Sequence, residues 1–228
     1  MERSRAPRRK VTRWQRWLWW AVAGFVAMTV LPVACVRFVD PPMSAFMLEH
    51  RLEGKVAHQT WVPLHRISPA MQRALIAGED QKFFTHFGFD LDAIDDAIED
   101  RLEGKSRRGA STLTQQVAKN LFLWPGRNFI RKGLEAWFTL LLEVLLPKER
   151  ILELHLNLAE YGDGVYGVEY AARANFGCSA ASLTPEQAAL LVAVLPSPKT
   201  RRVTAPSANA RERADWILDQ MKHVKLPE

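Results

Sequence analysis

Two adjacent acidic residues, Glu79 and Asp80, come just before a run of aromatic side chains that extends to Phe89. A carboxylate beside aromatic rings loses hydration, which raises its pKa and suits it to proton transfer near neutral pH. Glu79 is therefore a candidate general acid or base. The alternative is that both acids form a solvated helix end, with His86 as an ordinary surface side chain.

A second stretch, from Gly109 to Asn120, carries hydroxyl, amide and ammonium groups at helical spacing. Gln115 and Gln116 precede Lys119 by four and three residues, so a helix would place all three on one side. Side-chain amides suit sugar hydroxyls and N-acetyl groups, and the ammonium suits a phosphate. A capped helix with an ordinary polar face explains the same residues about equally well.

A third stretch combines two cations with a carboxylate. Glu135 lies four residues after Arg131 and three after Lys132, so a helix presents all three on one face. A simple ion pair between Arg131 and Glu135 would explain part of this pattern. The same face leads into the apolar block 136–142, which suits contact with lipid as well as a buried core. A cationic patch beside such a block indicates a substrate with a lipid-linked phosphate.

Helix signals dominate the segments that must position these groups. Ser68 and Thr184 each precede a proline, which is typical of an N-cap and first helical turn, and Gly78 can end the first of these helices. Thr112 can cap another. Further helices are expected at 90–102, 131–146, 148–157 and 207–222. The best strand signal, residues 59–63, is too short for a sheet, so we expect a mainly α-helical domain.

The first 44 residues differ in composition from the rest. Residues 1–16 hold seven basic residues against one acidic residue, which accounts for the whole formal net charge of +6. Residues 17–36 carry no charge and, at about 1.5 Å per residue, are long enough to cross a hydrocarbon core of roughly 30 Å. Basic residues and tryptophans before this run predict a cytoplasmic amino terminus. We therefore expect a basic cytoplasmic tail at 1–16, a transmembrane helix at 17–36, a linker at 37–44 and a periplasmic domain at 45–228.

Composition excludes several classes of protein. With 48% hydrophobic and 25% charged residues, the chain is neither disordered nor fibrous. The body after residue 16 has no net charge, which argues against nucleic-acid binding. Two cysteines are too few for a disulfide-stapled miniprotein, and because Cys35 lies in the apolar run we expect no bridge between it and Cys178.

Taken together, these stretches resemble the ordered motifs of the peptidoglycan glycosyltransferases, the transglycosylases that polymerise lipid II. The resemblance covers roughly residues 45–220, and five motifs in order make it specific. The chain ends where that domain would end, so we expect a monofunctional enzyme without a transpeptidase domain. The motifs are 79–90, 109–120, Arg131 with Lys132 and Glu135, 148–157, and a last set between 164 and 196.

The resemblance implies a lysozyme-like helical fold, preceded here by a single transmembrane helix, and a catalytic pair formed by Glu79 and Glu135. In this family the first glutamate is the general base for the sugar 4-hydroxyl of the incoming lipid II. The growing chain is the donor, which releases undecaprenyl pyrophosphate as the α-linkage is inverted to β. Glu135 would position the substrate or assist the leaving group. A divalent cation could assist Glu135 as a cofactor. The sequence does not decide this point, because it has no cluster of metal ligands.

The resemblance also assigns substrate-binding residues and partners. The pyrophosphate charge would be compensated by Lys119, Arg127, Arg131 and Lys132. Other residues implied in substrate binding are Asp80, Phe83, His86, Ser111, Thr112, Gln115, Gln116 and Asn120. Expected partners are lipid II, the growing glycan strand, the bacterial inner membrane, and proteins of cell-wall synthesis or division.

The sequence departs from the family pattern at a few positions. His155 stands where the family usually has tyrosine, and residues 174–175 and Cys178 replace what is often an aromatic and a lysine. None of these is one of the carboxylates or cations, so we expect effects on packing rather than on activity.

Two other functions are consistent with parts of the pattern. A lysozyme-like lytic hydrolase would use one glutamate as the acid that attacks existing glycan. However, a soluble glycan presents no pyrophosphate for the cationic patch. An inactive membrane-anchored scaffold for cell-wall partners is the alternative outside enzymes.

Overall fold

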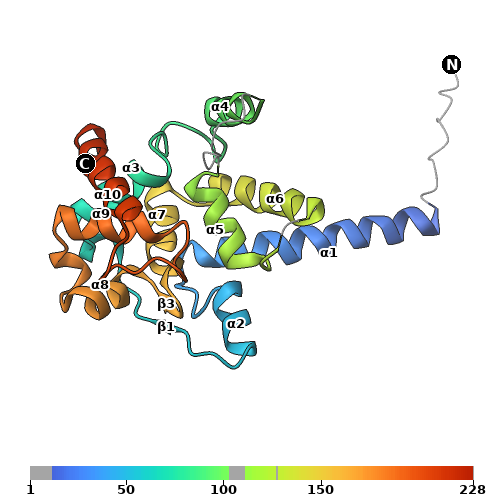
Figure 1. The fold of residues 1–228 in the computed structure, drawn as a ribbon. Helices are drawn as coiled ribbons and strands as arrows, with labels where there is room; N and C mark the ends of the chain where they lie inside the picture. The colour runs from blue at the N-terminus through green and yellow to red at the C-terminus, as the bar shows by residue number, and fades with distance from the viewer. Residues whose placement is uncertain (1–11, 103–110, 127, 228) are drawn as a thin grey trace, which may run out of the picture.

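The computed structural model describes residues 12–102, 111–126 and 128–227 (Figure 1). The prediction of a mainly α-helical protein is confirmed. The helices are α1 (Arg13–Val36), α2 (Ala45–Leu52), α3 (Pro69–Glu79), α4 (Leu91–Leu102), α5 (Leu113–Phe122), α6 (Phe129–Leu145), α7 (Lys148–Leu158), α8 (Val168–Phe176), α9 (Pro185–Val194) and α10 (Ala208–Gln220). The strands are β1 (His58–Gln59), β2 (Glu160–Gly162) and β3 (Val165–Tyr166), and short 3-10 turns are η1 (Leu64–Arg66), η2 (Ala180–Ser182) and η3 (Met221–His223).

Capping side chains start the helices where the sequence predicts. Thr112 and Thr184 accept hydrogen bonds from the backbone N–H three residues later, and each forms a capping box with the glutamine at that position. Ser68 caps α3 by accepting from the N–H of Ala70, and Ser207 caps α10 by accepting from the N–H of Ala210. The expected starts of these helices are therefore confirmed.

The prediction that Gly78 ends α3 is wrong, because the helix continues to Glu79. A Cβ atom at Gly78 would lie 2.6 Å from Cγ1 of Val192 on α9 and 3.1 Å from Cδ1 of Ile217 on α10. The glycine thus lets α3 approach both helices closely. Glu79 is the last residue of this helix.

The strand predicted at 59–63 is reduced to two residues. Beyond Gln59, the N–H of Val62 donates to Asn157 Oδ1 (2.9 Å) and the N–H of Leu64 donates to Glu153 Oε2 (2.8 Å). Side chains of α7 therefore satisfy the backbone where a strand would need a neighbour. The small sheet has the order β1-β3-β2, with β1 parallel and β2 antiparallel to β3.

Two packed groups of helices make up the body. In one, α3 lies against α9 and α10, and in the other α5 lies against α6 and α7. Their shared core contains fully buried side chains such as Leu75, Leu113, Leu152 and Val192. The two groups of helices thus place the end of α3 near α5, and the candidate residues lie on these two helices and on α6. Both cysteines are free, as expected.

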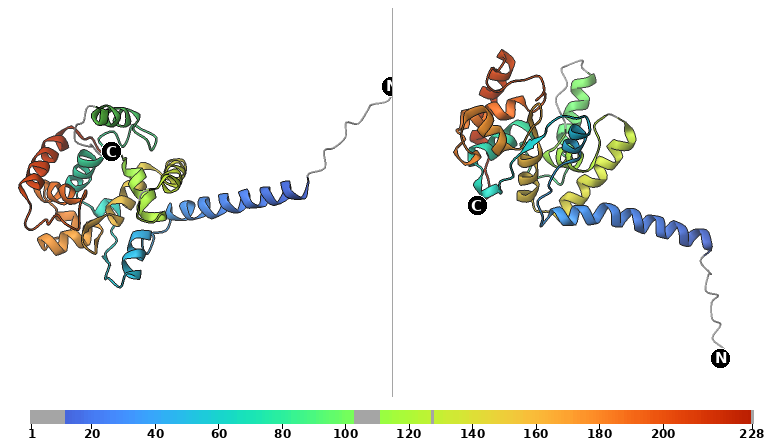
Figure 2. Two further views of the ribbon diagram at one scale, coloured as in Figure 1. Left: turned by 45° about the vertical axis from the view of Figure 1, so that its right-hand side comes forward. Right: turned by 90° about the horizontal axis from the view of Figure 1, so that it is seen from below.

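Helix α1 leaves the body as a long apolar rod (Figures 1 and 2). It is long and apolar enough to cross a membrane, with a mean hydropathy of 1.9 over its most apolar window. Its carboxyl end is fixed to α7, because Arg150 donates to the backbone oxygens of Val36 (2.8 Å) and Val39 (3.1 Å). The carboxyl-terminal part of α1 packs on α6, and the rings of Phe25 and Trp137 lie 6.0 Å apart.

Candidate active site

Glu79 lies at the end of α3 with a largely buried side chain, which is 13% exposed. Its Oε2 accepts a hydrogen bond from Gln116 Nε2 (2.9 Å), and its Oε1 lies 3.2 Å from the Arg213 guanidinium. Burial raises the pKa of the Glu79 carboxyl above its ordinary value, and the contacts with Gln116 and Arg213 oppose that shift. A buried, hydrogen-bonded carboxylate with a raised pKa is suited to accept a proton near neutral pH.

Gln116 connects Glu79 to a second buried residue. Its Oε1 lies 2.9 Å from Nε2 of His155, which projects from α7 and is 2% exposed. The expectation for His155 is an effect on packing rather than on activity, and the structure adds a polar contact with the side chain that holds Glu79. The link spans 39 residues of sequence, which is why the motif pattern alone did not indicate it.

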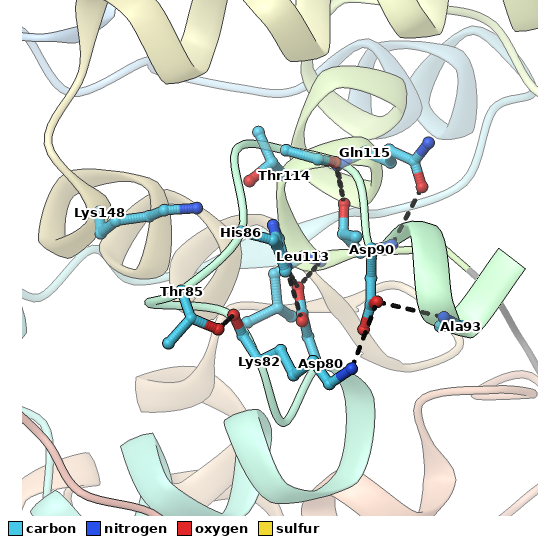
Figure 3. A network of polar contacts seen from close by, with 12 residues as sticks. Asp80, Lys82, Thr85, His86, Asp90, Ala93, Leu113, Thr114, Gln115 and Lys148 are labelled. Carbon is cyan, nitrogen blue, oxygen red and sulfur yellow. Dashed lines mark hydrogen bonds and ion pairs between the residues drawn. The ribbon is translucent and has the colours of Figure 1, made fainter.

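The side chain of Asp80 takes part in a network of polar contacts (Figure 3). Its Oδ2 accepts from the N–H of Leu113 (2.9 Å), and its Oδ1 lies 2.8 Å from Nε2 of His86. Phe83 is fully buried and lies under the ammonium of Lys148, 4.7 Å from the ring centroid. Asp80 thus connects the segment after α3 to the start of α5, and His86 contacts Asp80 within that segment.

The start of α5 uses some of its polar side chains for its own stability. Thr112 Oγ1 donates to the backbone oxygen of Gly88 (2.7 Å), and Gln115 Oε1 accepts from the N–H of Thr112 (3.0 Å). Asn120 is half-buried and lines neither of the hollows described below. Ser111, at the other end of this segment, is exposed.

Glu135 is held between two cations on α6. Its Oε2 lies 2.6 Å from Arg131 Nη1 and its Oε1 lies 2.5 Å from Lys132 Nζ. Glu135 and Arg131 are buried, whereas Lys132 is half-exposed. Asn128 caps the helix by accepting from the N–H of Arg131 (2.7 Å). The fourth predicted cation, Arg127, lies outside the described residues.

Two adjacent hollows bring these groups together. A hollow of about 440 Å³ is lined by Ser111, Gln115, Gln116, Lys119, Arg131, Lys132 and Glu135, among others. A smaller one of about 170 Å³ is lined by Glu79, Asp80, Ser111 and Thr112, among others. Ser111 lines both, and Gln116 reaches from the larger hollow to the Glu79 carboxylate. Ser111 and Gln116 therefore link the surroundings of the two glutamates.

Lys119 lies within the field of both glutamates. Burial lowers the pKa of its ammonium most strongly, and the nearby Arg131 and Lys132 lower it further. The carboxylates of Glu135 and Glu79 oppose this shift. Among the described residues, three cationic side chains and one carboxylate line the larger hollow, an arrangement that suits a ligand with several negative charges.

The residues around Glu135 do not fit a divalent cation. Both carboxylate oxygens already contact cationic nitrogens, and no other carboxylate among the described residues lines the larger hollow. A group that could ligate a metal occurs elsewhere, where ligand atoms of His50, Glu160 and Asp163 lie within 4.8 Å of one another. None of these three residues lines either hollow.

Comparison with known proteins identifies the family. A family model described as "Transglycosylase" matches residues 47–222. The chain belongs to the transglycosylase family. Its lysozyme-like helical fold and its assignment as a glycosyltransferase, both expected from the motifs, are thereby confirmed.

Three relatives of this transglycosylase carry the name "biosynthetic peptidoglycan transglycosylase". The relative from Shewanella oneidensis is 50% identical over 95% of this chain and 94% of its own length. One from Pseudomonas fluorescens is 50% identical over 90% of this chain and 88% of its own. One from Xanthomonas euvesicatoria pv. vesicatoria is 46% identical over 97% of this chain and 92% of its own length.

Sequence reasoning also missed Arg213 and Phe46, two further residues of the candidate site. Arg213 reaches Glu79 from α10, across 134 residues of sequence, and also donates to the backbone oxygen of Gly78 (3.0 Å). Phe46 of α2 lines the larger hollow, and its ring lies 5.7 Å from the Lys119 ammonium. Both come from segments whose sequence signals indicate only an amphipathic helix or a domain start.

Proposed function

We propose that this transglycosylase polymerises lipid II into glycan strands of peptidoglycan, with Glu79 as the general base. The observation that carries the proposal is that a buried Glu79 accepts a hydrogen bond from Gln116, a side chain that also lines the cationic hollow. A transferase of this kind needs a base for the incoming hydroxyl and compensation for an anionic leaving group. Glu79 would meet the first requirement and the cations of the larger hollow the second, and Gln116 contacts Glu79 and lines that hollow.

Glu79 would take the proton from the 4-hydroxyl of the incoming lipid II. The oxygen then attacks the anomeric carbon of the growing strand, and the bond from that carbon to the pyrophosphate breaks. Attack opposite the leaving group inverts the α-linkage to β. The raised pKa of Glu79 brings the proton affinity of the carboxylate closer to neutral pH, which favours this transfer.

The departing undecaprenyl pyrophosphate would lie in the larger hollow. Lys119, Arg131 and Lys132 line it, and charge-assisted hydrogen bonds from such groups stabilise a departing diphosphate. Arg127 is assigned to the same task by its motif position. Glu135 has both oxygens engaged by Arg131 and Lys132, so its proposed role is to hold these two cations in place.

A membrane position follows from α1 and α6 together. On α6, Phe129 is 97% exposed and Ile130 is 76% exposed, and Val144 is also exposed near the other end. Because α6 packs along the apolar α1, a bilayer crossed by α1 would also receive these side chains. We propose that the amino terminus is cytoplasmic and that the domain from residue 45 onward lies in the periplasm, with the cationic hollow open to lipid-linked substrate.

Polymerisation by variants at Glu79 tests the proposal. The full chain in detergent, given labelled lipid II, should form polymer, and Glu79→Gln should abolish it with unchanged helicity. Glu212→Gln is the matched control, because Glu212 is an exposed glutamate on α10. Polymerisation that survives Glu79→Gln would overturn the assignment of the base. Shortening of preformed glycan would instead favour the hydrolase, and binding without turnover would favour the scaffold.

A further inference from the structure

His155 is a buried, neutral side chain one hydrogen bond away from the partner of Glu79. Burial, together with the nearby Lys119, lowers the pKa of His155 to about 3. The imidazole therefore has one ring proton at neutral pH, on either Nε2 or Nδ1. Which nitrogen has it decides what the ring offers to Gln116.

The surroundings of the ring favour the proton on Nε2. Nδ1 is buried and has no hydrogen-bond partner within the described part of the chain. A buried N–H without a partner costs more than a buried nitrogen lone pair without one. With the proton on Nε2, the ring donates to Gln116 Oε1 at 2.9 Å, and the only unpaired atom is an acceptor.

This donor determines how the Gln116 amide is oriented. An amide group can present either its oxygen or its nitrogen to a given neighbour. Because His155 donates to Oε1, the amide presents Nε2 to Glu79, where it donates to Oε2 at 2.9 Å. The reverse orientation would present Oε1 to Glu79, which requires a protonated carboxyl, and would move the ring proton of His155 to the unpartnered Nδ1.

We propose that His155 is a positioning residue of this transferase: its Nε2–H locks the Gln116 amide as a donor to Glu79 and so favours the ionised carboxylate that accepts the substrate proton. The inference rests on the proposed role of Glu79 as base. It adds a residue that touches neither substrate nor Glu79 and acts through Gln116 alone.

Other charged or titratable groups also face Glu79, and they define what His155 contributes. Arg213 of α10 contacts Oε1, Lys119 of α5 contributes a positive field, and Tyr161 of β2 lies close enough to feel the negative charge of Glu79. None of these three contacts Gln116 in the hydrogen bonds of the described residues. The orientation of the amide is therefore set by His155.

The first test uses the unaltered full-length protein in detergent. Nitrogen-15 spectra of the His155 ring, assigned by their loss in His155→Gln, report which nitrogen has the proton. The proposal expects a neutral ring protonated on Nε2 between pH 5 and pH 9, consistent with a pKa of about 3. A ring protonated on Nδ1, or on both nitrogens at neutral pH, would overturn it.

The second test compares two variants of similar side-chain length. His155→Gln keeps an N–H donor near the position of Nε2, whereas His155→Met removes it. Loss of the donor should raise the pKa of Glu79, move the acidic limb of the kcat/KM profile to higher pH and lower kcat at pH 7 about threefold to tenfold. The KM for lipid II should stay unchanged, because the cations of the larger hollow keep their places.

A merely structural role for His155 would give a different result. It would lower the activity of both variants alike, or lower kcat at every pH without moving the acidic limb, and either outcome refutes the inference. The carbon-13 titration of the Glu79 carboxyl, assigned by its absence in Glu79→Gln, separates this inference from the proposed function. The positioning role predicts that His155→Met shifts the titration of Glu79 and that His155→Gln does not. This result would support the positioning role even if Glu79→Gln remained active and Glu79 were not the base.

Discussion

The close approach of α3 to α9 and α10 predicts that a methyl group at Gly78 destabilises the protein. A Cβ atom there would lie 2.6 Å from Val192 Cγ1 and 3.1 Å from Ile217 Cδ1, and both neighbours are fully buried. Overpacking of this kind costs about 1–3 kcal/mol, and here the upper part of that range applies because both neighbours are β-branched and unable to move aside. Replacing a helical glycine by alanine also stabilises the helix by about 1 kcal/mol, because alanine has the higher helix propensity. We expect Gly78→Ala to lower the free energy of unfolding by about 1–2 kcal/mol, which corresponds to about 2–8 °C in Tm.

Thermal unfolding of the full chain in detergent measures this effect. Gly133→Ala is the matched control, because Gly133 lies in α6 with no atom within 4 Å of its added Cβ. That control should raise the free energy of unfolding by about 0.5–1 kcal/mol. In a Val192→Ala background the substitution at Gly78 should no longer be destabilising. Equal Tm changes for Gly78→Ala and Gly133→Ala would refute the packing argument.

Three further outcomes are expected. Lys119→Ala and Arg131→Ala should each lower kcat/KM for lipid II by about 2 kcal/mol, or roughly thirtyfold, while Lys222→Ala at an exposed position should not; unchanged rates in both would place the phosphate site elsewhere. Because burial raises the native pKa of Glu79 above its unfolded value, its ionisation destabilises the fold as pH rises through the native pKa. Glu79→Gln should therefore have a higher Tm than wild type at pH 7, a difference that shrinks as pH falls below that pKa, and a constant difference would contradict this reasoning. Phe129→Asp should lower turnover severalfold in lipid vesicles with a smaller loss in detergent, whereas equal losses would exclude a membrane role for this side chain.

Local sequence signals predicted most of the helical framework because they act over three or four residues. Thr112 with Gln115 and Thr184 with Gln187 satisfy the first N–H groups of their helices whatever the rest of the chain does. The same locality made the Arg131–Glu135 pair predictable. Gly78 was misjudged because its role is decided by Val192 and not by its neighbours in sequence.

The parts of the site that escaped prediction are contacts between distant segments. Arg213 meets Glu79 across 134 residues and His155 meets Gln116 across 39, and no periodic pattern encodes either contact. The short strands β2 and β3 were missed for a related reason, since two or three residues are too few to show alternation. Motif resemblance singled out both glutamates as candidates, but the hydrogen bonds of Glu79 required the structure.

The most direct test of Glu79 as the base compares two titrations of the same protein. One is the acidic limb of kcat/KM for lipid II polymerisation, which reports the ionisation of an essential group in the free enzyme. The other is the carbon-13 titration of the Glu79 carboxyl itself. The account predicts that both give the same pKa, raised above that of an ordinary glutamate. A Glu79 carboxyl that titrates at a clearly different pH from the kinetic limb would contradict it.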